Sequence, residues 1–211
     1  MKDTLATSMS SIVEQPSSAP GLSRLSRVAV EAVSIELLAY VGTRLAHVRT
    51  AGRLARSLSR LFEPDEAELL VAAATLHDIG YAPRIARTGF HPLDGAVFLR
   101  AEGFPDRLAS LVAHHSHAVM TAEHHGVCDL AEQFPREDSL LSDALVFADM
   151  HSAPDGSIIP AERRLADIVG RHTHPAVQAR DRSLRTSIAR IECALTEASP
   201  RAVTLPGPAG R

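Results

Sequence analysis

Apolar residues recur at every third or fourth position along most of the chain, which is the spacing of one face of an α-helix. A first helix is predicted around Leu25 to Leu38, a second from Leu45 to Leu61, and a third from Pro64 to Gly80. No segment shows the alternation of apolar and polar residues that is typical of a half-buried strand. The apolar stripe of the first helix consists of Leu25, Val28, Ala32, Ile35 and Leu38. The pattern therefore predicts an all-α protein that forms a compact helical bundle.

The second half of the chain predicts shorter helices. Pro92 and Pro105 are expected at helix starts, because proline suits the first turn of a helix. The segment 138–151, DSLLSDALVFADMH, carries an apolar helical stripe that leads to a carboxylate. Two further helices are predicted at Ala161 to His172 and Pro175 to Leu195.

The length of 211 residues fits one domain. The aromatic residues are few, with six Phe, two Tyr and no Trp, so the core must consist mostly of Ala, Leu, Val and Ile. Residues 1–22 and 198–211 lack apolar periodicity, and we expect a disordered N-terminal arm and a flexible C-terminal tail around a helical domain at 23–197.

The formal net charge of −3 gives no general reason to expect nucleic acid or a membrane as a partner. The N-terminus lacks the apolar stretch of a signal peptide, and no later segment approaches the roughly 18 apolar residues of a membrane span. The two cysteines, Cys128 and Cys193, match neither a disulfide framework nor a zinc motif. We therefore expect a cytoplasmic protein, and the pattern leaves its oligomeric state open.

Histidine is frequent, with eleven residues, and several His and Asp side chains lie at the edges of apolar helix faces. His47, the pair His77 and Asp78, and Asp149 are predicted on three different helices. A lone His in such a place is most often a hydrogen-bonded core residue. Together, however, the four residues match the way in which a helical bundle builds a metal site. Imidazole and carboxylate ligands favour Fe, Mn, Co or Zn over Ca or Mg.

The ordered set H…HD…D resembles the signature of the HD-domain superfamily of metal-dependent phosphohydrolases. The resemblance covers Leu45 to Met150, and LHDIGY is similar to the HDIG variant of the family. It implies an all-α fold in which His47, His77, Asp78 and Asp149 bind a divalent transition metal.

Two further segments, GFHPLDGAVFL and LVAHHSH, are similar to the additional His segments of the binuclear branch of this superfamily. This resemblance implies that His91 and His114, with His115 as a further candidate, bind a second ion. Asp78 would then bridge the two ions. The expected cofactor is one or two divalent ions.

The implied reaction is attack of metal-activated water on a small phosphorylated substrate, such as a nucleotide. Asp78 would act as a catalytic residue through the ions. Arg49 and Arg84, which follow the ligands closely in sequence, are candidates to bind phosphate, because a guanidinium group suits phosphate oxygens. Tyr81 could donate a hydrogen bond to substrate or to the nucleophilic water, or it could be a packing residue at a helix end.

Two departures from the sequence patterns of related enzymes narrow the range of expected substrates. The residues after His115 lack the GYP sequence of the cyclic di-GMP hydrolases that share the extra His residues. Tyr81 stands where similar deoxynucleoside monophosphatases carry a catalytic Glu.

Two other functions remain open. One is a mixed-valent diiron oxygenase, because some HD-fold proteins activate O₂. The other is a non-catalytic, metal-binding regulatory module.

Overall fold

A computed structural model gives the fold of residues 26–171 and 174–198. The arm predicted at 1–22 and all but the first residue of the tail predicted at 198–211 lie outside these ranges. That first residue, Ala198, is the last residue of the last helix. The longer helices are α1 (Arg27–Leu38), α2 (Arg44–Ser57), α3 (Pro64–Leu76), α4 (His91–Ala101), α5 (Asp106–His114), α8 (Leu140–Met150), α9 (Ala161–Arg171) and α10 (Pro175–Ala198). Short turns of helix between them are η2 (Ser59–Leu61), η3 (Ile79–Tyr81), η4 (His115–His117), α6 (Val119–Ala122), η5 (Glu123–His125) and α7 (Leu130–Gln133).

The predicted all-α class is confirmed. The described residues are helical apart from loops, turns and one isolated antiparallel β-bridge between Ser152 and Ile158. Pro64 occupies the first turn of α3, where its missing N–H costs nothing, and Asp65 and Glu66 favour the positive end of the helix dipole. These local preferences explain why α3 begins where the sequence predicts.

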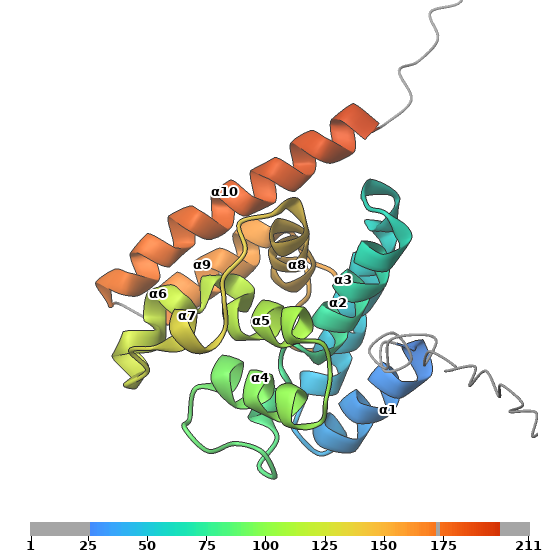
Figure 1. Cartoon of the computed structure of the whole chain (residues 1–211). Helices are drawn as coiled ribbons and strands as arrows, with labels where there is room; N and C mark the ends of the chain where they lie inside the picture. The colour runs from blue at the N-terminus through green and yellow to red at the C-terminus, as the bar shows by residue number, and fades with distance from the viewer. Residues whose placement is uncertain (1–25, 172–173, 199–211) are drawn as a thin grey trace, which may run out of the picture.

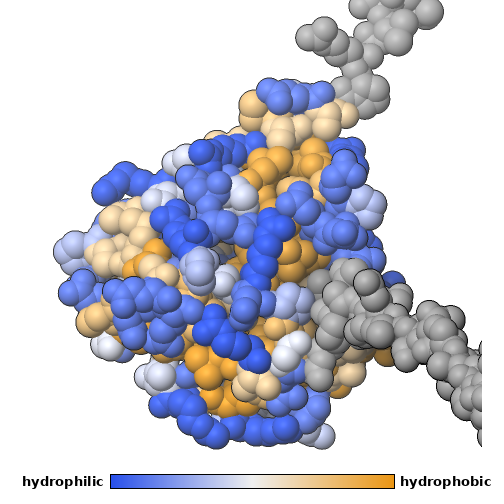
Figure 2. All heavy atoms as spheres, viewed as in Figure 1, coloured by the Kyte–Doolittle hydropathy of each residue, from blue (hydrophilic) through white to orange (hydrophobic). Residues whose placement is uncertain are grey.

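Small apolar residues let the helices approach closely. In the core, α2 packs on α3, and α4 packs on α5. The long helix α10, which runs diagonally in Figure 1, packs on α8. Polar side chains cover most of the face seen in Figure 2, with apolar side chains between them. No helix in the described ranges is long and apolar enough to cross a membrane. The fully buried core residues include Ala51, Ala55, Ala73, Ala74, Ala144, Leu70, Leu76 and Leu108.

The third helix differs from its prediction, because it ends at Leu76 and not at Gly80. The chain continues into η3, where the Tyr81 N–H donates to the Asp78 carbonyl over 3.1 Å. The tighter turn changes the direction of the chain and allows α4 to pack against η3. His77 and Asp78 therefore lie at a helix end.

Candidate metal centre

Six side chains from separate parts of the chain converge inside the bundle. One comes from the middle of α2, two from the end of α3, one from the first turn of α4, one from the residue after α5, and one from the last turn of α8. Five are buried, and one is partly exposed, with 23% of its side chain accessible. In chain order they are His47, His77, Asp78, His91, His115 and Asp149; His91 is the partly exposed one.

The first group is formed by His47, His77 and Asp78, whose ligand atoms all lie within 4.8 Å of one another. The Nε2 atoms of His47 and His77 are 3.1 Å apart. Asp149 adjoins this group, with its Oδ1 atom 3.1 Å from His47 Nε2 and 3.7 Å from His77 Nε2. The four residues of the H…HD…D pattern thus meet in space.

The second group is formed by Asp78, His91 and His115. The Nε2 atoms of His91 and His115 are 3.1 Å apart. Asp78 Oδ1 lies 3.3 Å from His91 Nε2 and 3.7 Å from His115 Nε2. Asp78 therefore belongs to both groups, which is the arrangement that a bridging carboxylate requires.

Backbone carbonyls orient three of the imidazole rings. The Nδ1 atoms of His77 and His115 lie 2.9 Å from the Ala74 carbonyl oxygen and 2.6 Å from the Val112 carbonyl oxygen. His47 Nδ1 is 3.3 Å from a carbonyl oxygen as well. A carbonyl only accepts, so Nδ1 must carry the hydrogen, and the Nε2 lone pairs point into the centre. This donor set fits a divalent transition-metal ion.

The protonation states also suit a cation. Burial lowers the pKa of His77, and it lowers the pKa of His115 to about 3, so both rings are neutral at pH 7. Burial opposes the ionised form of Asp149, but the neighbouring imidazoles of His47 and His77 outweigh it and hold the pKa of this carboxyl well below its usual range. Neutral imidazoles beside an ionised carboxylate are the states that a metal ion needs.

The comparison with protein families agrees with this geometry. The sequence model of the HD domain matches residues 44–153, which is just over half of the chain. The chain belongs to the HD-domain family. No curated protein and no solved structure matches it. The family match spans all six side chains of the centre, whereas α9 and α10 of this HD protein lie beyond it.

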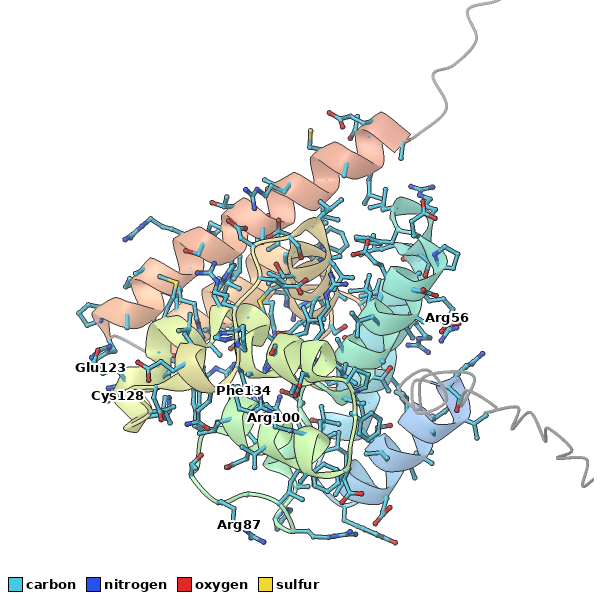
Figure 3. The ribbon with its side chains drawn as sticks, viewed as in Figure 1. Arg56, Arg87, Arg100, Glu123, Cys128 and Phe134 are labelled. Atoms are coloured by element: carbon cyan, nitrogen blue, oxygen red, sulfur yellow. The ribbon has the colours of Figure 1, made fainter. Side chains whose placement is uncertain are left out.

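The HD protein departs from its sequence prediction at His114, which points away from the centre. Its Nε2 atom lies 2.6 Å from the carbonyl oxygen of Phe134, the residue over whose ring Arg100 stacks at 3.9 Å (Figure 3). His114 is the last residue of α5 and contacts Phe134, whereas His115 follows the end of the helix and contacts His91 in the centre. The geometry assigns the second group to His115 and gives His114 a packing role.

This assignment can be tested with paired alanine variants. His115→Ala should lower the metal content by about one ion per chain, because it removes a ligand of the second group. His114→Ala should retain the wild-type metal content, since it removes only a bond to a backbone carbonyl. Metal analysis of both purified variants decides the point, and loss of metal in His114→Ala alone would reverse the assignment.

The centre opens into a cavity of about 710 Å³. Arg44 and Tyr81 line it beside the ligands. Arg44 Nη1 donates to Asp78 Oδ2 over 2.7 Å, and its guanidinium carbon lies 4.1 Å from the centre of the Tyr81 ring. That ring stacks on His91 at 3.9 Å. Burial, with the negative charge of Asp78, raises the pKa of Tyr81 to about 12, so its hydroxyl group remains a hydrogen-bond donor.

The two arginines predicted to bind phosphate lie elsewhere. Arg49 is two residues after His47, so the helix turns it away from the centre, and it approaches Glu31 at 3.9 Å beside a separate cavity. Arg84 is exposed and pairs with Glu36. Arg87, a third arginine close to the ligands in sequence, likewise points away from the helices in Figure 3. The structure therefore corrects Arg49 and Arg84 to surface residues.

Several polar residues at the centre were missed by the sequence analysis. Arg44 could have been found, because it lies one helical turn before His47 on the same face. Ser116 donates its hydroxyl hydrogen to Asp149 from a backbone with φ of 52°, a left-handed conformation that is unusual for a residue other than glycine. Arg164 and Arg180 also line the cavity, from α9 and α10, and no sequence pattern connects them with the ligands.

Proposed function

We propose that this HD protein is a metal-dependent phosphohydrolase that acts on a small organic phosphoester. The observation that carries the proposal is the convergence of four imidazoles and two carboxylates at the wall of a cavity, with Asp78 shared by two ligand groups. These residues would hold divalent ions, which would supply water activation near neutral pH and polarisation of a phosphoryl oxygen.

The residues around the ligands have separate tasks in this reaction. Asp78, which belongs to both ligand groups, would hold both ions. Arg44 orients Asp78 through its ion pair and presents positive charge to the substrate phosphate. The Tyr81 hydroxyl group donates a hydrogen bond to a phosphate oxygen. Ser116 donates a hydrogen bond to Asp149, which orients this carboxylate beside His47.

The rest of the cavity favours a substrate of roughly nucleotide size. Its volume of about 710 Å³ exceeds that of a phosphate group, and its wall combines aromatic, apolar and charged side chains. Phe90 and His125 lie with ring centres 5.0 Å apart, and His124 stacks on His174 at 4.2 Å. Such rings offer flat surfaces to the organic part of a substrate.

A second candidate function is a diiron oxygenase. The four imidazoles around a shared carboxylate favour it, because imidazole with carboxylate suits iron and the two ligand groups adjoin one another. A product that forms under air and not under argon would support the oxygenase over the hydrolase.

The decisive experiment measures metal content and phosphate release together. Protein purified without chelators or affinity metals should contain a transition metal and release phosphate from a panel of phosphoesters under argon. Asp149→Ala should lose both metal and hydrolysis, because it removes a ligand of the first group. Asp143→Ala is the matched control, a buried carboxylate of α8 that pairs with Arg190 at 3.1 Å and should keep both. Full hydrolysis in Asp149→Ala would contradict the proposal.

A further inference from the structure

Two arginines of the cavity wall have no salt-bridge partner in the part of the chain that the structure describes. Arg164 on α9 is buried, with 8% of its surface exposed, and Arg180 on α10 is half-buried. The Nε atom of each is inaccessible and without a hydrogen bond. Among residues 26–171 and 174–198, no carboxylate oxygen lies within 4.0 Å of a guanidinium nitrogen of either residue. Both side chains line the cavity that contains the metal ligands.

Three other arginines of the same two helices are paired. Arg171 bonds to Asp167, Arg185 lies 2.9 Å from Asp181, and Arg190 lies 3.1 Å from Asp143. Burying an unpaired charge inside a protein is costly, so buried charges are normally paired with an opposite charge or bound to a ligand. Burial lowers the pKa of Arg180, which reflects this cost. No residue in the described ranges pairs with Arg164 or Arg180, and a bound anion would supply the missing partner.

Charge balance separates this anion from the reacting phosphate. Two divalent ions together with Arg44 outweigh Asp78 and Asp149, and the surplus suffices for one phosphate group and a hydroxide nucleophile. The positive charges of Arg164 and Arg180 then remain. Two guanidinium groups match the double charge of a phosphate better than the single charge of a carboxylate, and their planar forks bind phosphate oxygens well.

We infer that Arg164 and Arg180 form a second anion-binding subsite, and that the substrate carries a second phosphate group in addition to the one that reacts at the metal centre. The inference rests on the proposed function. It assigns substrate selection to α9 and α10, while α2, α3, α4 and α8 with the turn after α5 hold the ions.

Direct binding of inorganic phosphate to the metal-loaded protein tests the subsite without any turnover. Calorimetry should find two phosphate ions per wild-type chain. Arg164→Gln and Arg180→Gln should each weaken one of these binding events about tenfold to a hundredfold, as expected for loss of a charged hydrogen bond. Arg163→Gln and Arg182→Gln are the matched controls, because these exposed neighbours do not line the cavity, and they should bind phosphate as the wild type does.

Kinetics with paired substrates test the second phosphate. Wild-type protein should have a lower KM for a nucleoside 3′,5′-bisphosphate than for the corresponding 5′-monophosphate. Arg164→Gln and Arg180→Gln should raise the KM for the bisphosphate about tenfold and leave kcat and metal content nearly unchanged. Because Arg180 is half-buried, its variant gives an independent result should the Arg164 variant fold poorly.

The outcomes distinguish the inference from the proposed function. Phosphate binding at wild-type stoichiometry and affinity in both variants would overturn the subsite, even if the protein hydrolyses phosphoesters. Equal KM values for the two substrates in wild-type protein would overturn the second phosphate. If the arginine variants lose one phosphate while the wild type hydrolyses no phosphoester, the subsite stands and the proposed reaction is wrong.

Discussion

Asp78→Ala is expected to remove every ion from the metal centre and to reduce hydrolysis to the rate in buffer. The reason is that Asp78 is common to both ligand groups, whereas each His belongs to one. Metal content should fall from about two ions per chain to none. Elemental analysis after dialysis, with circular dichroism to confirm that the helices persist, measures the effect.

His91→Ala provides the comparison for this experiment. It removes a ligand of the second group only, so the metal content should fall to about one ion per chain while the group around His47 and His77 retains its ion. Equal metal content in the Asp78 and His91 variants would show that Asp78 does not bridge. A wild-type protein that binds one ion under saturating Mn or Fe would make the centre mononuclear.

Gly80→Ala should destabilise the fold strongly. A Cβ atom at this position would lie 1.9 Å from the carbonyl oxygen of His91 and 2.8 Å from the backbone nitrogen of Gly95. Both are backbone atoms of α4, which cannot move aside as a side chain can. We expect a loss of about 3 kcal/mol or more in the free energy of unfolding, measured by urea denaturation. The folded fraction should also lose the second ion, because displacement of α4 moves His91.

Gly170→Ala is the matched control for the glycine experiment. It lies in α9, and a Cβ atom there would meet nothing within 4 Å. Alanine favours a helix over glycine by about 1 kcal/mol, so this variant should be as stable as the wild type or more stable. Wild-type stability and metal content in Gly80→Ala would disprove the proposed close contact between η3 and α4.

Much of the fold follows from local patterns in the sequence. Apolar periodicity and the proline at the first turn predict α3, and a carboxylate at the end of an apolar stripe predicts the place of Asp149 in the centre. The predicted end of α3 at Gly80 was wrong by four residues, because η3 replaces the last turn of the helix. That change depends on the packing of α4, which no local pattern encodes.

The site residues divide in the same way. Helical periodicity would have separated Arg44 from Arg49 on α2. It could not have chosen between His114 and His115, because the preceding residues of α5 from Leu108 to Ala113 are all buried and His115 lies beyond the helix. Arg164 and Arg180 are different, since their approach to the centre depends on how α9 and α10 pack against the remainder of the bundle.

The position of Arg164 and Arg180, outside the segment that matches the HD-domain family, has a consequence for how substrate preference can change. The ligands of the centre lie within residues 44–153, and both arginines lie beyond them. Substitutions in α9 and α10 can therefore change which compounds enter the cavity without disturbing the ions. Under the proposed function, a change of substrate would need few changes among residues 44–153, and proteins that share this centre should differ most in charge along the helices that follow it.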